Sequence, residues 1–235
     1  MQTAQTSIDF AQGVILIDKP YQWTSFDIVG KIKSLIKHQL KIKTKVGHAG
    51  TLDPLATGLL ILCTGSNTKR IEEFQALEKE YIGTMILGAT RPSFDMETEI
   101  DNTYEIGSIS REELVEATKT FTGNISQIPP LFSAKKIEGQ RAYEFARKGI
   151  EKKLEPKNVL ISKFEITKIN LPEISFCVVC SKGTYIRSLV HDFGKKLNNG
   201  AYLSELRRTR IGKYHVDNAH NIEQIEEIIK LKTED

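Results

Sequence analysis

The sequence predicts an α+β fold built on a mixed sheet, and two observations support this prediction. Segments with strand patterns and segments with helix patterns follow one another without a regular βαβ alternation. The 235 residues show no internal repeat and no low-complexity segment, and they suffice to bury a substantial core. We therefore expect residues 1–235 to form a single domain.

The first half of the chain predicts three strands and one helix. Apolar runs at residues 13–18, 59–63 and 81–88 are typical of strands, and residues 90–95 have the composition of a surface loop. Between the first two strands we expect a helix that Thr24 or Ser25 caps. The apolar face predicted for this helix consists of Phe26, Val29, Ile32 and Ile36.

The second half predicts four helices and two strands. A capping box at Ser110–Glu113 opens a helix through about Phe121, which Gly123 can end. A short amphipathic helix is expected at 142–148, strands at 159–169 and 173–180, and a last helix at 221–232. Before that last helix, Thr184 can cap another one with a core-facing stripe and Arg187 beside it. The members of that stripe are Ile186, Leu189, Val190, Phe193 and Leu197.

The composition excludes several classes of protein. No apolar stretch is long enough to span a membrane, and no secretory signal is apparent at the N-terminus, so a cytoplasmic location is the default expectation. Three cysteines argue against a disulfide framework. Cys177 and Cys180 lie in an expected strand, where their sulfurs would point to opposite faces, and no second pair completes a zinc site. We expect both to be small core residues, no bound metal and, without coiled-coil heptads, a monomer.

The net charge of +3 is unevenly distributed. Residues 28–52 contain six lysines and no acidic residue, and two further basic stretches lie at 135–153 and 207–213. Such patches favour a polyanionic partner. A solvated lysine face is about equally common on this observation alone.

The most informative segment is Gly47-His48-Ala49-Gly50-Thr51-Leu52-Asp53-Pro54-Leu55-Ala56-Thr57-Gly58-Leu59-Leu60. Its glycines permit backbone angles that other residues resist, and Pro54 pushes Asp53 toward an extended conformation. We expect a stiff loop that holds the Asp53 carboxylate in a set direction, seated on a buried strand. The alternative for an isolated Asp-Pro pair is a plain tight turn.

This segment matches every fixed position of the active-site motif of the TruB-type tRNA pseudouridine synthases, G-H-x-G-x-L-D-P-x-A-x-G-x-L. The resemblance extends from about Gly13 to Val216, although Tyr21-Gln22 departs from the family pattern. Further motifs of the family occur in its order: Lys19-Pro20 with Thr24-Ser25, Lys79-Glu80-Tyr81, Ile128–Ala134 with Gly139–Arg147, Lys182–Arg187 and Leu206-Arg207-Arg208.

The resemblance implies the pseudouridine synthase fold, with a mostly antiparallel central sheet flanked by helices. It also implies a thumb-like insertion at about 125–153 that closes on RNA, while the chain has no room for the C-terminal PUA domain of many members. The implied substrate is the T-arm of tRNA, at the T-loop uridine of position fifty-five. The chemistry requires no cofactor.

The resemblance also assigns roles to residues. Asp53 is the catalytic carboxylate, with Arg187 as its charged partner, and Tyr81 stacks on the base and is a candidate for removing the C5 proton. The implied substrate-binding residues are His48, Tyr81, Tyr185, Leu206, Lys19 and Pro20, of which the last two are expected to pack against the Asp53 loop. Residues expected to contact the RNA backbone are Lys135, Lys136, Arg141, Arg147, Lys152, Lys153, Arg207 and Arg208.

Two alternatives remain beside a catalytic isomerase. One is an inactive module that binds or folds tRNA, which would be expected to lose Asp53, Tyr81 or Arg187, although all three are present. The other is an N-glycosidase, since a carboxylate attacking C1′ is also glycosidase chemistry. Glycosidases usually need a second carboxylate, and no matching motif supplies one.

Overall fold

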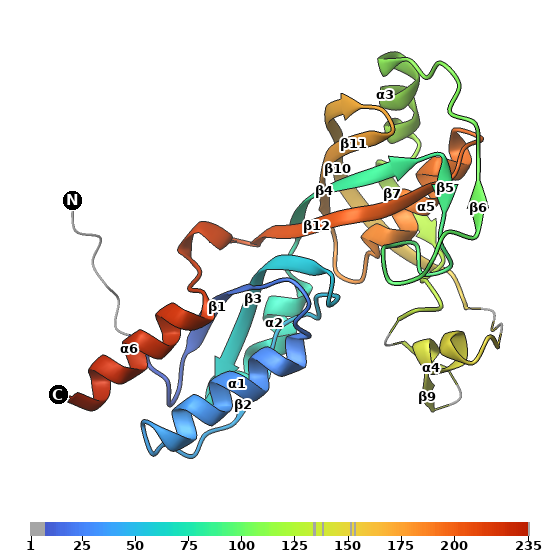
Figure 1. The fold of residues 1–235 in the computed structure, drawn as a ribbon. Coiled ribbons are helices and arrows are strands. Elements are labelled where there is room, and N and C mark those ends of the chain that lie inside the picture. The colour runs from blue at the N-terminus through green and yellow to red at the C-terminus, as the bar shows by residue number, and fades with distance from the viewer. Residues whose placement is uncertain (1–7, 134, 138, 151, 153, 235) are drawn as a thin grey trace, which may run out of the picture. The chain divides into compact units, whose positions relative to one another are not determined.

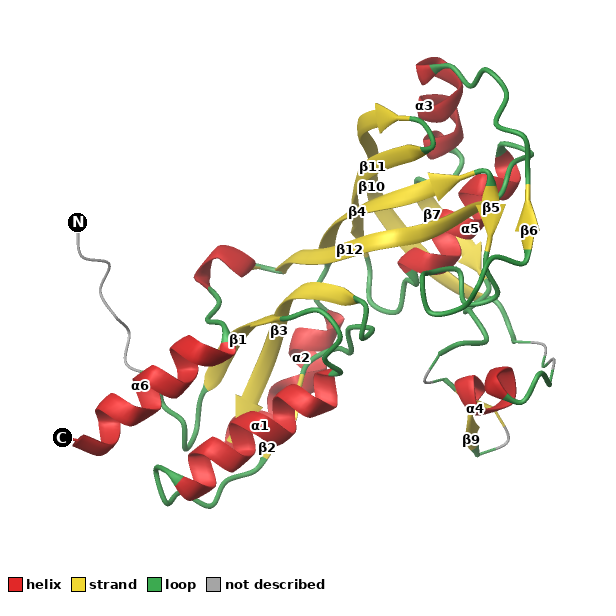
Figure 2. Ribbon diagram, viewed as in Figure 1, coloured by secondary structure: helices red, strands yellow, loops and turns green. Residues whose placement is uncertain are grey.

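The computed structural model describes residues 8–133, 135–137, 139–150, 152 and 154–234. The chain forms two compact units, the first made of residues 1–79 with 207–235 and the second of residues 80–206. Both units combine strands with helices, which confirms the predicted α+β class (Figures 1 and 2). No helix in the described part of the chain is long and apolar enough to cross a membrane.

The described part of the first unit contains three helices, two 3₁₀ turns and the strands that pair between them. In chain order these elements are β1 (Val14–Lys19), α1 (Ser25–His38), β2 (Val46–His48), β3 (Ala56–Thr64), η1 (Gly65–Arg70), α2 (Ile71–Ala76), the end of β12 (Ala201–Ile211), β13 (Tyr214–His215), η2 (Val216–Asn218) and α6 (Ile222–Glu234).

Strand β3 lies at the centre of this unit. It pairs antiparallel with β1 and with β2, and β12 is its neighbour on the side away from β1. Its run from Leu59 to Cys63 is fully buried because both faces are covered. Leu60 and Leu62 pack with α1 and α6, whereas Leu59, Ile61 and Cys63 pack with Phe74 of α2. The predicted strand at 59–63 is therefore a core strand.

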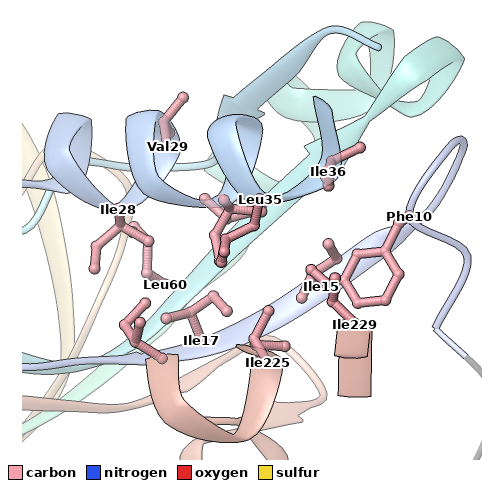
Figure 3. Packing of buried hydrophobic residues seen from close by; sticks show 13 residues of the cluster. Phe10, Ile15, Ile17, Ile28, Val29, Leu35, Ile36, Leu60, Ile225 and Ile229 are labelled. Carbon is pink, nitrogen blue, oxygen red and sulfur yellow. The ribbon is translucent and has the colours of Figure 1, made fainter. Parts of the chain in front are cut away.

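The core between α1 and α6 follows the periodicity of both helices. Figure 3 shows Ile28 and Leu35 of α1 and Ile225 of α6 converging on Ile17 of β1. Burial of such side chains contributes about 1.5–3 kcal/mol each to the free energy of unfolding. This cluster fixes α1, and with it the segment that enters the helix.

The second unit is built on the order β12-β4-β11-β10-β7. Strand β10 runs antiparallel to both β11 and β7, and α3 packs on β10 and on α5. The elements of this unit are β4 (Lys79–Leu87), β5 (Ala89–Thr90), β6 (Asn102–Thr103), α3 (Arg111–Lys119), β7 (Gly123–Gln127), β8 (Lys136–Ile137), β9 (Gln140–Arg141), α4 (Ala142–Arg147), β10 (Lys157–Asn170), β11 (Glu173–Cys180), α5 (Ile186–Lys196) and the start of β12.

Several predicted details of the fold are wrong. Phe26 is 77% exposed, because the buried face of α1 consists of Ser25, Ile28, Val29, Ile32, Leu35 and Ile36. Thr184 does not cap α5: its hydroxyl donates to the Ser181 carbonyl, and Tyr185 occupies the N-cap position without a side-chain cap. Gly123 opens β7, since α3 already ends at Lys119.

The segment 90–95 is also not a surface loop. Thr90, Ser93 and Asp95 are buried, and Asp95 pairs in a bridge with Leu203 of β12. Of the cysteines, Cys63 and Cys180 are buried as expected, whereas Cys177 is partly exposed. Strands β7 and β12 were not predicted, because their main pairing partners lie far away in the sequence, and β2 was not predicted because its three residues form no apolar run.

Candidate active site

The segment from Ala49 to Gly58, which we call the Asp53 loop, connects β2 to the interior of β3. Asp53 and Ala56 close a turn through a 3.1 Å bond from the Ala56 N–H to the Asp53 carbonyl, with Pro54 at the position that its fixed φ favours. The Asp53 side chain is half-buried. The tight turn that was the alternative for an isolated Asp-Pro pair is present, and the Asp53 carboxylate lies on it.

Side chains from three other elements hold this loop by its backbone. The first is Lys19 at the end of β1, which is 0% exposed. Its ammonium donates to the carbonyls of Pro20 (2.9 Å), Trp23 (2.6 Å) and Pro54 (3.3 Å). The Pro54 carbonyl also accepts from the Gln22 N–H at 2.9 Å, where Gln22 adopts a φ of 68°. Lys19 therefore joins the turn that enters α1 to the turn that carries Asp53.

The second side chain that holds the loop is that of Ser25, the first residue of α1. Its buried hydroxyl accepts from the Leu52 N–H at 2.9 Å and donates to the Leu52 carbonyl at 3.3 Å. Leu52 directly precedes Asp53, so this pair of bonds fixes the approach to the carboxylate. Thr24 and Asp27 form a capping box that orders the first turn of α1 around Ser25.

The third side chain that holds the loop is that of Arg208 in β12, which is 1% exposed. Its guanidinium donates to the Leu59 carbonyl (2.7 Å) and to the Gly50 carbonyl (3.1 Å). Gly58 makes this approach possible: it has a φ of +103°, and a Cβ there would lie 2.3 Å from the Arg208 carbonyl oxygen. A buried guanidinium cannot reach a phosphate, so the prediction that Arg208 contacts the RNA backbone is wrong.

Lys19 lies against the Asp53 loop, as expected, but its surroundings do not suit the second role expected for it, direct contact with the substrate. Its ammonium is enclosed by carbonyls, and we assign it to positioning the Asp53 loop, not to direct substrate contact. Burial lowers the pKa of Lys19 to about 8, although the negative charge of Asp53 opposes the shift. Pro20 remains exposed beside it.

His48 precedes the Asp53 loop at the end of β2. Burial is the main cause that lowers its pKa, the positive charge of Arg208 adds to it, and a hydrogen bond with the Gly50 backbone opposes it. The imidazole is therefore neutral at physiological pH. Its ring meets the ring of Phe26 edge-on, with the centroids 6.5 Å apart.

The second unit carries the other predicted site residues. Tyr81 lies in β4 and is 9% exposed, and Leu206 of β12 is half-buried. Tyr185 stands at the start of α5, where the side-chain amide of buried Gln127 donates to its carbonyl (3.0 Å) and accepts from its N–H (2.8 Å). This two-point bond fixes the backbone of Tyr185 to the end of β7.

Arg187 is buried in the first turn of α5. Its Nε lies 3.4 Å from Asp95 Oδ2, and its terminal nitrogens donate to the carbonyls of Ser93 (3.1 Å) and Phe132 (2.9 Å). Asp95 and Gln127 are not among the predicted site residues, because neither lies in one of the short motifs that carry the family resemblance. The only signal for Asp95 in the sequence is a carboxylate at the end of a segment whose composition predicts a surface loop.

The predicted basic contacts differ in their surroundings. Among the described residues of the insertion, Arg141 is exposed, Arg147 pairs with Glu97 at 3.1 Å, Lys135 donates to the Glu155 carbonyl, and Lys152 lies over the Phe145 ring. Lys136 belongs to β8, and Lys153 lies outside the described residues.

Arg207 of β12 binds Asp18 of β1 through two bonds of 3.0 and 2.7 Å, a bidentate arrangement. Its side chain keeps 37% exposure, so a phosphate contact by Arg207 stays a prediction. Within the part of the chain that the structure describes, no three His, Cys, Asp or Glu residues are grouped to hold a metal.

Comparison with known families matches almost the whole chain. Residues 37–186 match the model described as TruB family pseudouridylate synthase (N terminal domain). Residues 187–235 match the model described as tRNA pseudouridylate synthase B C-terminal domain. The two matches meet inside the first turn of α5, at Ile186 and Arg187.

Curated relatives of similar length share about half of the residues. A protein of Parabacteroides distasonis named tRNA pseudouridine synthase B is 54% identical over 95% of this chain and 96% of its own length. One of Flavobacterium johnsoniae with the same name is 53% identical over 96% of this chain and 100% of its own.

Solved structures with the same fold are longer. A chain in the crystal structure of a Cbf5-Nop10-Gar1 complex matches with a TM-score of 0.70 and 28% identity, covering 93% of this chain. A chain of an H/ACA RNP bound to a substrate RNA containing 2′-deoxyuridine matches with a TM-score of 0.67 and 26% identity, covering 96%. This chain spans 54% and 55% of those two chains.

Proposed function

Because this chain belongs to the TruB family of pseudouridylate synthases, we propose that it converts a uridine of tRNA to pseudouridine, at position fifty-five of the T-loop. Relatives that share about half of its residues over nearly their whole length bear the name tRNA pseudouridine synthase B. The T-arm as the bound element is part of the proposal. With tRNA as substrate, the enzyme acts in the cytoplasm.

The reaction is an isomerisation. The N1–C1′ bond of the uridine breaks, the uracil turns while it remains bound, and C5 bonds to C1′. C5 then releases a proton and N1 carries one, so atoms and charge balance without an oxidant or a reductant. The protein has to supply a carboxylate beside the sugar, a closed space for the loose base and a proton acceptor.

The single observation that carries the proposal is the way in which Asp53 is held. Lys19, Ser25 and Arg208 bind the backbone of the Asp53 loop at Pro54, Leu52 and Gly50, on both sides of the carboxylate. A carboxylate that must meet one sugar carbon gains from such preorganisation, because little reorganisation remains when the reaction begins. A plain surface turn needs no such support.

Asp53 would act in its ionised form, either on C1′ to give a glycosyl ester or on C2′ to give a glycal. Arg187 as its charged partner, Tyr81 as stacking platform and C5 base, and Tyr185 and Leu206 as walls of the base pocket are proposals that the family resemblance supports. Arg187 also binds Asp95 and two carbonyls, so its guanidinium is rigidly placed.

The target base has to leave the RNA stack before it reacts, which costs a few kcal/mol. Neutral His48 and the basic insertion are the proposed sources of compensation, through contact with the opened RNA and with its phosphates. Binding should then weaken with rising salt.

The decisive experiment is single-turnover conversion of an unmodified T-arm stem-loop and of full-length tRNA, read by pseudouridine-specific mass labelling. We expect product from the wild type and none from Asp53→Asn, with RNA affinity nearly unchanged. Asp217→Asn is the matched control, because Asp217 is an exposed aspartate of the same unit. Loss of affinity together with activity in Asp53→Asn would make Asp53 a structural residue.

Other outcomes separate the alternatives. Tight tRNA binding without product from the wild type would favour an inactive binding module. Free uracil with an abasic site would indicate an N-glycosidase. Product from tRNA but not from the stem-loop would place essential contacts outside the T-arm.

A further inference from the structure

Phe26 is the most exposed large hydrophobic side chain among the described residues, at 77%. It lies in the first turn of α1, whose buried face is filled by other residues. An exposed phenylalanine by itself is common on protein surfaces and needs no explanation. Its position relative to the Asp53 loop makes this one different.

The residues on either side of Phe26 are anchored. The Ser25 hydroxyl holds the Leu52 backbone in both directions, and Asp27 closes the capping box by accepting from the Thr24 N–H at 2.8 Å. Phe26 therefore stands on a rigid turn that is tied to the residue preceding Asp53. These bonds fix the backbone of Phe26 relative to the Asp53 loop.

The Phe26 ring meets the His48 ring edge-on, at an interplanar angle of 79°. His48 is mostly neutral, because burial and the Arg208 charge lower its pKa. Despite this contact the phenylalanine side chain keeps 77% exposure, so most of its ring is open to solvent. Two aromatic rings at right angles, one of them open to solvent, border the entry to the Asp53 loop.

The charge of the surrounding segment selects the class of partner. Residues 28–52, which include the rest of α1, contain no acidic residue. Lys33, Lys37, Lys41, Lys43 and Lys45 in this segment are exposed. An open aromatic ring at the start of a helix that runs into a lysine-rich, exposed segment combines the two features that bind unstacked bases of single-stranded nucleic acid, a stacking surface and positive charge.

We propose that Phe26 is a base-stacking residue, which takes up a nucleobase of the RNA loop next to the flipped uridine and thereby favours the opened loop. The inference rests on the proposed function and deepens it, because it names a contact for the RNA beside the reacting nucleotide. Stacking stabilises the state in which the target base has left the RNA stack, so it lowers the free-energy cost of flipping.

The test compares Phe26→Ala, Phe26→Leu and Phe26→Trp for affinity to a T-arm stem-loop and for single-turnover rate. Alanine should weaken affinity by about 5- to 150-fold, the range expected for one base–aromatic stack. Tryptophan should retain wild-type affinity, and leucine should resemble alanine because it restores bulk without a π-face. Leu231→Ala is the matched control, since Leu231 is 60% exposed on α6 of the same unit.

A stem-loop with 2-aminopurine beside the target uridine reports stacking directly. We expect quenching on binding to the wild type and to Phe26→Trp, and bright fluorescence with Phe26→Ala. Full affinity and quenching in Phe26→Ala would overturn the proposal. Rescue by leucine as complete as by tryptophan would also overturn it, because the ring would then only pack on His48.

Failure of the inference and failure of the proposed function remain distinguishable. The affinity and fluorescence measurements are repeated in the Asp53→Asn background, where no conversion is required. If the wild type produced no pseudouridine, the proposed function would fall while the stacking test still gave its answer. If the wild type is active and the Phe26 variants match it, only the stacking role falls.

Discussion

At the scale of single residues, Lys19 shows how a buried charge can serve a neighbouring reaction. Its ammonium donates hydrogen bonds to three carbonyls, one of which belongs to Pro54 in the turn that carries Asp53. A neutral amine has only two N–H groups, so deprotonation releases one carbonyl. It also removes a positive charge that acts on Asp53.

The pKa of Lys19 predicts opposite trends for activity and stability. In the folded protein it lies at about 8, below the ordinary value of 10.5, so between these values the unfolded chain holds more protons. The contribution of Lys19 to the free energy of unfolding therefore rises with pH in this window. The single-turnover rate should instead fall above about pH 8, as the Asp53 loop loses its clamp.

Lys19→Met tests this prediction. We expect about a 10- to 100-fold lower rate at neutral pH, the scale on which a misplaced reacting group costs activity. The alkaline decline near pH 8 should be absent in this variant. A decline that persists in Lys19→Met would belong to the RNA or to another residue, since the substrate is the same.

At the scale of elements, α1 and α3 begin with the same capping motif, but only α1 supports the proposed site. Each opens with a complete capping box, Thr24 with Asp27 and Ser110 with Glu113. The first turn of α1 also carries Ser25, whose hydroxyl holds Leu52. The first turn of α3 has no residue in the proposed site.

Thr24→Ala and Ser110→Ala form a matched pair. Each should lower the free energy of unfolding by about 1 kcal/mol, as loss of an N-cap does. Only Thr24→Ala should slow the single-turnover rate, because a frayed α1 loosens the Ser25–Leu52 contact. Denaturant titration and rate measurement on both variants check this, and an equal rate loss in both would argue that stability alone limits activity.

At the scale of the whole molecule, the sequence distributes its positive charge over three stretches, and the structure separates them by role. Arg208 is buried in the first unit, where its guanidinium donates to two carbonyls, and Arg207 is bound to Asp18. Lys135, Arg141 and Lys152 of the insertion carry charge that tertiary packing has not buried. They are the strongest candidates for a phosphate footprint.

Replacing Lys135, Arg141 and Lys152 together with glutamine should weaken tRNA binding and flatten its salt dependence. Each lost phosphate contact reduces the slope of log affinity against log salt by about 0.7–0.9. Binding measured over a range of salt concentrations gives this slope. The control replaces Lys168, Lys230 and Lys232, which are exposed outside the insertion, and an equal change in both variants would remove the insertion from the footprint.

Local sequence patterns were enough to locate many of the strands, the starts of two helices and the loop that carries Asp53. Apolar runs located β1, β3, β4, β10 and β11, because a buried strand needs a continuous or alternating apolar pattern wherever it pairs. Capping chemistry located the starts of α1 and α3, since a cap is satisfied within four residues. The glycines and the proline around Asp53 indicated a stiff loop, and the turn is there.

Tertiary structure decided what depends on distant partners. Strands β7 and β12 were not predicted, since their main pairing partners lie far along the chain, and β2 was not predicted because its three residues carry no apolar run. Phe26 was wrongly placed on the apolar face of α1, although it lies beside the buried face. Arg208 looks like a surface charge in the sequence, yet three-dimensional packing encloses it, together with Lys19, against carbonyls of the Asp53 loop. A charged side chain can be judged as RNA contact or loop support only when its partners are known, because burial and hydrogen bonding are properties of the folded chain.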